Sequence, residues 1–352
     1  MSKDHPHKEG FIPEYVLKEL ADRGNVNAQK TLEKMKLIEN KVEKEKKNTQ
    51  GINLLHSSNI AERLIYDSEN TDQFKRKLVR REEDPPTSDE VVKIMFDFCG
   101  KTLEYLKNKL HRNSIDDQGM DIIANVHYFD GELNNAFYFP EIKQLAFGDG
   151  DGTSFKNFAK SIDVVAHEIA HGVTHHLNQL EYERQSGALN EHFSDVIGTA
   201  VQQFAKGQTA ETADWLIGDE IVGPLWPGKA LRSMKAPGTA YDGDRQVAHF
   251  NDFDPNLSLD DDNGGVHYYS GIPNKAFFLT AVKIGTDNAA FLWYTAWHNR
   301  AIIHPRATFK EALQAILEAA KTLVNRGELP PETVSVVKNA FEEVGVSTPV
   351  PV

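Results

Sequence analysis

The sequence of 352 residues has one cysteine, no long apolar run and fewer basic than acidic residues. Because Cys99 is the one cysteine, no intrachain disulfide can form, and its neighbours Met95, Phe96 and Phe98 predict a core position. No apolar run approaches the roughly eighteen residues that a transmembrane helix needs, so we expect no membrane partner. The net charge of −13 argues against nucleic acid as a partner. The remaining composition, 40% hydrophobic and 26% charged, is typical of a soluble enzyme with a sizeable core.

Residues 1–50 differ in character from the rest of the chain. Their start, MSKDHPHKEGFIPEY, lacks the apolar core of an ordinary signal peptide. Residues 13–48 have apolar side chains at helical spacing, with Asn25 as a candidate cap, and lead into the lysine-rich run KVEKEKKNTQG. We interpret 1–50 as a short propeptide and cleavable linker. The alternative is a solvated helical arm with no further role.

The remainder divides into two lobes by its patterning. Residues 51–160 alternate strand-like runs such as DIIANVHYF with turn signals and one helical stretch, whereas the chain from residue 161 onward is mainly helical. The last strong helical run, TFKEALQAILEAAKTLVNRG, is closed by Gly327. We predict an α+β fold with a β-rich N-terminal lobe, residues 51–177, which includes the first helix after residue 161, and a helical C-terminal lobe, residues 178–352.

The stretch VVAHEIAHGVTHH contains His167, Glu168 and His171 in the order H-E-x-x-H. Residues four apart share one face of a helix, so both imidazoles can point at one metal ion, with Glu168 beside them. Two histidines and one carboxylate leave a coordination position open on zinc, and an open position distinguishes a catalytic site from a structural one. The alternative is a polar helix face that arises by chance. The apolar flanks disfavour it, because buried polar groups must find partners.

A second run, SGALNEHFSDVIGTA, supplies the carboxylate. Glu191 can be the third ligand, and Asp195, one helical turn later, can accept the N–H of a liganding imidazole. We predict one catalytic zinc ion. The longer metzincin signature is disfavoured, because it needs glycine and histidine where this chain has Thr174 and Leu177. His175 is expected on the exposed helix surface.

Several further motifs accompany these two runs: LNNAF at 133–137, FGDGDG at 147–152, ALRSM at 230–234 and DNGGVHYYSGIPNKA at 262–276. In this order and over about residues 51–345, the chain resembles the thermolysin-like metallopeptidases, the M4 family. The resemblance implies a thermolysin-like two-lobe fold with the zinc helix between the lobes. It also implies a zinc endopeptidase that acts on protein or peptide substrates and cuts on the amino side of large hydrophobic residues.

By position, the resemblance also assigns catalytic roles. The zinc ligands would be His167, His171 and Glu191. Glu168 would be the general base, which takes a proton from water and passes it to the leaving amine. The residues that bind the oxyanion would be Tyr182 and His267, with Asp262 orienting His267, and the residues that hold the ligands in place would be Asn190 and Asp195.

The resemblance assigns substrate contacts in the same way. Asn135, the carbonyl of Ala136 and Arg232 would bind the substrate backbone. The hydrophobic pocket for the residue after the scissile bond would be lined by Phe155, Phe158, Val164, Ile217, Ile221 and Leu231. Taken singly, such residues are more often packing or surface positions, so the assignment depends on their joint order.

The sequence departs from the family at its calcium positions. The positions that match the family's calcium ligands beside the active-site helix are Asp163, Gln202, Asp214, Leu216 and Asp219. Calcium affinity follows the number of charged oxygen ligands, and two of the five have lost theirs. We therefore expect at most one weakly bound calcium ion, held by the three aspartates. Lys229 stands at another calcium position, which predicts the loss of that site.

The segment FIPEYVLKEL at 11–20 resembles the short propeptide of the protealysin-like group of this family, although Glu14 stands where that group often has a second proline. The resemblance implies a zymogen whose own propeptide inhibits it in the cleft. We expect a monomer that is secreted by a route without an ordinary signal peptide; retention in the cytoplasm is the alternative. One alternative function is a zinc aminopeptidase, for which the chain lacks a G-x-M-E-N motif. The other is a catalytically inactive binding homologue, against which Glu168, Tyr182 and His267 argue.

Overall fold

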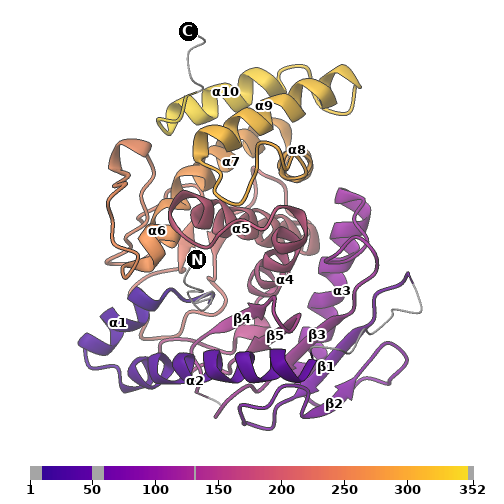
Figure 1. The fold of residues 1–352 in the computed structure, drawn as a ribbon, viewed down its shortest axis with the longest axis vertical. Helices are drawn as coiled ribbons and strands as arrows, with labels where there is room; N and C mark the ends of the chain where they lie inside the picture. Colours follow the sequence, from indigo (N-terminus) through magenta and orange to yellow (C-terminus); the bar gives the residue numbers. More distant parts are fainter. Residues whose placement is uncertain (1–9, 50–58, 131, 348–352) are drawn as a thin grey trace. The chain divides into compact units, whose positions relative to one another are not determined.

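The structure of this chain is a computed structural model that describes residues 10–49, 59–130 and 132–347 (Figure 1). The chain divides into two compact units. The first comprises residues 1–103, 113–172 and 220–226, and the second comprises residues 104–112, 173–219 and 227–352. The division passes through two helices, α3 (Glu90–Leu110) and α4 (Ile162–Leu177). The predicted boundary of the propeptide at residue 50 lies outside the described residues.

The first unit is built on a five-stranded sheet with the order β2-β1-β3-β5-β4. Its strands are β1 (Arg63–Asp67), β2 (Lys77–Arg80), β3 (Ile122–Val126), β4 (Ala136–Phe139) and β5 (Gln144–Phe147). The three inner strands run parallel, whereas β2 and β4 pair antiparallel at the two edges. Because β4 is an edge strand, its outer backbone groups can pair with another extended segment.

The N-terminal segment of the first unit forms two helices, α1 (Glu14–Asp22) and α2 (Val26–Thr49). The sequence predicted helical structure across 13–48, but the structure interrupts it, because Gly24 has a φ of 92° that a helix cannot contain. Asn25 restarts the helix: its Oδ1 accepts the backbone N–H of Ala28 at 2.9 Å. The predicted cap at Asn25 is therefore confirmed.

Cys99, which is buried, and His127, which is half-buried, are titratable groups of this unit with shifted pKa values. Cys99 is fully buried in α3, as predicted, and burial raises the pKa of its thiol to about 12. His127 lies between two carboxylates: Nδ1 is 2.8 Å from Asp149 and Nε2 is 3.1 Å from Asp89. The hydrogen bond to Asp149 raises the pKa of His127, burial opposes it, and the two negative charges bring the pKa to about 9.

The second unit is helical, drawn from dark red through orange to yellow in Figure 1. Its elements are α5 (Arg184–Lys206), β6 (Leu216–Ile217), β7 (Arg232–Ser233), η2 (Phe250–Asp252), α6 (Asp262–Tyr269), α7 (Gly271–Ile284), α8 (Thr286–Trp297), α9 (Phe309–Asn325) and α10 (Thr333–Glu343). The central helix α5 packs against α6, α7, α8 and α9. Every residue of α5 from position 186 to position 203 is buried, so side chains on this helix are held rigidly from several directions.

The boundaries of α9 follow from local sequence. Thr308 and Glu311 form a reciprocal capping box at its start, and Gly327, with a φ of 71°, follows its end as predicted. None of the described helices combines the length and the apolar composition that a membrane-spanning helix requires.

Candidate active site

The predicted metal-binding helix is α4, and a short 3-10 helix, η1 (Phe158–Lys160), precedes it. His167, Glu168 and His171 are all buried on it, with at most 5% of each residue exposed. The two imidazoles face each other, with their Nε2 atoms 3.0 Å apart. Two buried imidazole nitrogens in this arrangement suit a shared metal ion, as the helical spacing predicted. His175, by contrast, is exposed, as expected.

Glu191 on α5 completes a group of possible metal ligands. One nitrogen from each of His167 and His171 and one carboxylate oxygen of Glu191 all lie within 4.8 Å of one another. Glu191 is only 1% exposed. Two imidazoles and one carboxylate are the donor set of catalytic zinc sites, so the side chains present fit a zinc ion.

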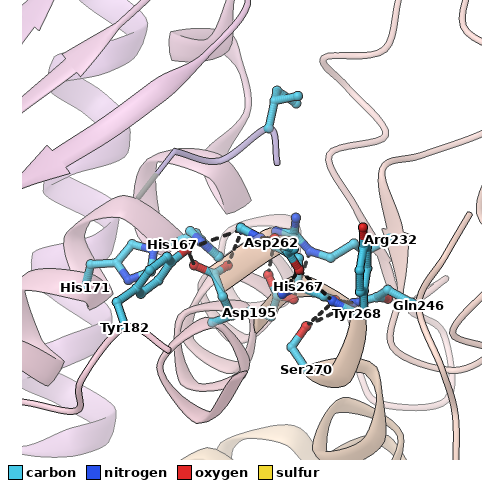
Figure 2. Close-up of polar contacts among 12 residues, drawn as sticks. His167, His171, Tyr182, Asp195, Arg232, Gln246, Asp262, His267, Tyr268 and Ser270 are labelled. Carbon is cyan, nitrogen blue, oxygen red and sulfur yellow. Dashed lines mark hydrogen bonds and ion pairs between the residues drawn. The ribbon is translucent and has the colours of Figure 1, made fainter. Parts of the chain in front are cut away.

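In the second unit, Tyr182, Glu191 and His267 form one hydrogen-bonded cluster. Figure 2 shows Tyr182 and His267. The Tyr182 hydroxyl donates to Glu191 Oε1 at 2.5 Å and lies 3.3 Å from His267 Nε2. His267 Nε2 is 3.4 Å from Glu191 Oε2. The two residues predicted to bind an oxyanion therefore lie beside the predicted third ligand.

The orientation of His267 depends on an unusual backbone in α6. Four successive residues from Asp262 to Gly265 have positive φ, which the glycines at positions 264 and 265 adopt without strain. This turn brings Asp262 back over the helix, where Oδ2 accepts the N–H of His267 at 2.7 Å and Oδ1 lies 2.6 Å from His267 Nδ1. With Nδ1–H donating to Asp262, Nε2 points toward Tyr182.

The charges around His267 favour its protonated form. Burial lowers the pKa of His267, but the carboxylates of Glu191 and Asp262 more than offset this effect, and the pKa is raised. A protonated His267 carries an N–H on Nε2 and can donate a hydrogen bond there. Gln246, which sequence reasoning missed, donates to the His267 carbonyl at 3.1 Å and to Ser270 Oγ at 3.0 Å (Figure 2).

Arg232 and Asp195 form a buried bidentate ion pair (Figure 2). Arg232 Nε and Nη2 donate to the two oxygens of Asp195 at 3.0 and 2.8 Å, and the Arg232 side chain is 3% exposed. Asn274 also donates to Asp195, at 2.9 Å. The sequence predicted roles for Arg232 and Asp195 but not their pairing. It gave Asn274 no role, although this residue lies in the motif at 262–276. Asn190, also predicted, is buried on α5.

In the first unit, the predicted substrate-binding edge is already engaged by the N-terminal segment. Phe11 N–H donates to the Ala136 carbonyl at 3.0 Å. The Asn135 side chain accepts the N–H of Ile12 at 2.9 Å and donates to the Ile12 carbonyl at 3.1 Å. The ring of Phe11, fully buried, stands edge-on to His167 at a centroid distance of 5.1 Å.

The N-terminal segment makes further contacts with the first unit between positions 10 and 41. Gly10 lies so close to Asn135 that an added Cβ would come within 2.6 Å of its amide nitrogen. Thr31 accepts the N–H of Asn134 at 3.2 Å. Ion pairs join α2 to the rest of the unit at Lys30 and Glu132, Lys34 and Asp130, and Lys41 and Asp72.

The residues predicted for the hydrophobic pocket are all buried, and they fall in both units. In the first unit Phe155 packs on Phe158 with ring centroids 5.8 Å apart, and the Ile221 carbonyl accepts the N–H of Lys156 at 2.7 Å. In the second unit Leu231 N–H donates to the Ile217 carbonyl at 2.9 Å. The six predicted pocket residues, all fully or almost fully buried, are Phe155, Phe158, Val164, Ile217, Ile221 and Leu231.

The candidate calcium residues have different surroundings. Asp163 is fully buried and accepts a short hydrogen bond from the Ser161 hydroxyl. Asp214 is exposed and accepts the N–H of Leu216 at 3.1 Å. Asp219 is half-buried. A calcium ion at these residues stays a prediction.

Comparison with known proteins identifies the class. Residues 24–175 match the catalytic domain of thermolysin metallopeptidases, and residues 178–346 match the alpha-helical domain of the same enzymes. The chain belongs to the thermolysin (M4) family of metalloproteases, and the predicted thermolysin-like fold is confirmed. The family is zinc-dependent.

Particular relatives agree with this assignment. An extracellular metalloprotease of Pectobacterium carotovorum subsp. carotovorum is 40% identical over 294 residues, which are 81% of this chain and 81% of the relative. Protease PrtS of Photorhabdus sp. (strain Az29) is 38% identical over 297 residues, 82% of this chain and 77% of the relative. Among solved structures, the protealysin precursor, a metalloproteinase from Serratia proteamaculans, superposes with a TM-score of 0.83 at 35% identity. It covers 96% of this chain and 100% of its own. The predicted resemblance to the protealysin-like group is confirmed.

Proposed function

We propose that this metalloprotease is made as the zymogen of a zinc endopeptidase, which hydrolyses peptide bonds on the amino side of large hydrophobic residues. The observation that carries the proposal is the buried group of His167, His171 and Glu191, whose ligand atoms lie within 4.8 Å of one another. When bound there, zinc would polarise the substrate carbonyl and lower the pKa of a water molecule to about 7.

The protein's own side chains supply the remaining chemistry. Glu168, one residue after the first ligand, takes a proton from the attacking water and passes it to the leaving amine. His267 Nε2 and the Tyr182 hydroxyl donate hydrogen bonds to the oxygen on which negative charge develops, and Asp262 holds His267 in the donating orientation.

Substrate binding uses β4 and Arg232. An extended peptide beside the edge strand would donate to the Ala136 carbonyl and exchange hydrogen bonds with the Asn135 amide, while Arg232 would hold a substrate carbonyl. The six buried apolar residues of the predicted pocket favour Leu, Phe, Ile or Val after the scissile bond.

The N-terminal segment acts as the inhibitor of this same edge. Residues 11 and 12 occupy the hydrogen-bonding groups of Asn135 and Ala136 that a substrate would need. Both cannot bind at once, so the segment blocks the site until it is removed. We propose that removal occurs in the lysine-rich linker, partly by the enzyme itself, and that the enzyme is secreted as a monomer by a route without an ordinary signal peptide.

Glu168→Gln tests the assignment of the general base. The variant should keep zinc, measured by elemental mass spectrometry, and its rate of peptide hydrolysis should fall by about 10²- to 10⁴-fold. His171→Ala should lose both zinc and activity. Release of zinc by Glu168→Gln, or activity within about tenfold of the wild type, would contradict the role of Glu168.

The same proteins test maturation and the alternative functions. Purified wild type should shorten from its N-terminus on incubation, whereas Glu168→Gln should stay full length. A peptide blocked at its N-terminus should be cut internally, which an aminopeptidase could not do. Full activity of the unprocessed wild type would contradict the inhibitory role of the N-terminal segment.

A further inference from the structure

A buried chain of hydrogen bonds runs through the second unit and ends at Arg232. Trp293 Nε1–H on α8 donates to His192 Nε2 at 2.7 Å, and His192 Nδ1 is 2.7 Å from Asn274 Oδ1 on α7. Asn274 Nδ2 donates to Asp195 Oδ2 at 2.9 Å, and Asp195 receives the bidentate Arg232 (Figure 2 shows this last pair). None of these five residues is more than 3% exposed.

We propose that His192 is a positioning residue for peptide hydrolysis, which fixes the guanidinium of Arg232 through Asn274 and Asp195. The inference rests on the proposed function, in which Arg232 holds a substrate carbonyl. It adds residues that sequence reasoning assigned no role, and it places one of them, Trp293, four contacts away from Arg232.

The direction of donation along these hydrogen bonds is fixed by the residues at their two ends, Trp293 and Asp195. An indole N–H can only donate, so His192 Nε2 must accept, and the neutral imidazole then carries its proton on Nδ1. The Nδ1–H of His192 donates to Asn274 Oδ1, which leaves Asn274 Nδ2 facing Asp195. A carboxylate can only accept, so one arrangement alone satisfies every bond. A flipped Asn274 would place its oxygen against Asp195 and repel it.

The position of Asp195 matters because a bidentate pair needs the carboxylate and the guanidinium in one plane. Asn274 Nδ2 and Arg232 Nε share Asp195 Oδ2, and Arg232 Nη2 takes Oδ1. Rotation of the carboxylate would weaken all three bonds together. Asn274 thus restrains the rotation of Asp195, and His192 restrains Asn274.

Packing alone gives a weaker account of His192. Its ring is fully buried among Phe277, Trp293 and Trp297, at centroid distances of 6.5, 6.3 and 6.1 Å. An apolar side chain would fill this space without the cost of burying an imidazole. The imidazole contributes what an apolar side chain cannot, a donor toward Asn274 and an acceptor toward Trp293.

Three variants and one control separate positioning from packing. His192→Leu fills the space but interrupts the series of hydrogen bonds, and Trp293→Phe removes the indole N–H while keeping an aromatic ring. His192→Gln restores one acceptor and one donor. The control, Phe193→Leu, alters a neighbouring buried residue that stacks on Trp297 at 5.2 Å and makes no bond in the chain.

We expect His192→Leu and Trp293→Phe to lower kcat/KM for a peptide by about tenfold relative to Phe193→Leu, because each loses the restraint on a charged hydrogen bond. His192→Gln should stay within about threefold of wild type. In an Arg232→Gln background, His192→Leu should cause no further loss, because the two residues act through one contact. Equal effects of His192→Leu and Phe193→Leu, or additive losses in the Arg232→Gln background, would overturn the proposal.

A spectroscopic measurement makes the test independent of activity. In ¹⁵N-labelled full-length protein, the Arg232 Nε–H should give a slowly exchanging resonance, identified by its loss in Arg232→Gln. His192→Leu should shift it or speed its exchange, and Phe193→Leu should not. An unchanged resonance in His192→Leu overturns the positioning role. Failure of the wild type to cut any peptide would instead refute the proposed function, while the resonance still decides the role of His192.

Discussion

Phe11→Ala should release the N-terminal segment from the predicted substrate-binding edge. The Phe11 ring is fully buried and stands against His167, so its loss removes a large apolar contact at the point where the segment meets the site. The backbone bonds of residues 11 and 12 to Ala136 and Asn135 do not depend on the ring. The variant therefore weakens docking without altering those hydrogen-bonding groups.

The size of the effect follows from the burial of Phe11. Truncating a fully buried phenylalanine to alanine costs about 3 to 5 kcal/mol in protein cores. Taking the lower figure, because the undocked segment regains some freedom, the population of undocked molecules should rise about a hundredfold. The ion pairs of α2, including Lys34 with Asp130, remain and keep the segment folded onto the unit for most of the time.

Trypsin cleavage in the presence of a zinc chelator measures this population. The chelator prevents self-cleavage, and mass spectrometry follows cleavage after Lys34, which is 6% exposed and needs undocking to be cut. When opening is fast relative to cleavage, the rate tracks the undocked fraction. Phe11→Ala should be cut about a hundredfold faster than wild type, and the control Val26→Ala, at a site 63% exposed, should match wild type. A rate for Phe11→Ala within about threefold of wild type would refute the reasoning.

Two further predictions concern pH and substrate preference. The pKa of His127 is about 9 in the folded chain and near 6.5 when unfolded, so its stabilising effect is complete below about pH 6.5 and is lost as the pH rises through about 9. His127→Gln should lower the urea-unfolding free energy by about 1 to 2 kcal/mol at pH 6 and by almost nothing at pH 10; equal losses would contradict this. Cleavage-site profiling should show Leu, Phe, Ile or Val after the scissile bond, with about fourfold preference per added methylene, whereas dominance of charged residues or glycine would exclude the proposed pocket.

The sequence by itself determined the features that depend on local spacing. The positions of His167 and His171 on one helix face follow from the helical period, and the cap at Asn25 and the helix end at Gly327 follow from the chemistry of helix ends. The order of the motifs then identified the family, and with it the fold class. These signals are readable because each one lies within a few residues of chain or within one motif.

Tertiary structure alone decided which distant residues meet. Helical period places Asp195 and His192 on α5 but says nothing about Arg232, Asn274 or Trp293, which reach them from other elements. The pattern of a strand, likewise, does not say whether the strand lies at the edge of a sheet or what pairs with its backbone groups. Long-range packing decides that the edge next to Asn135 binds residues 11 and 12 of the same chain. Burial stabilises contact with any complementary segment, and the fold determines which segment lies close enough to bind.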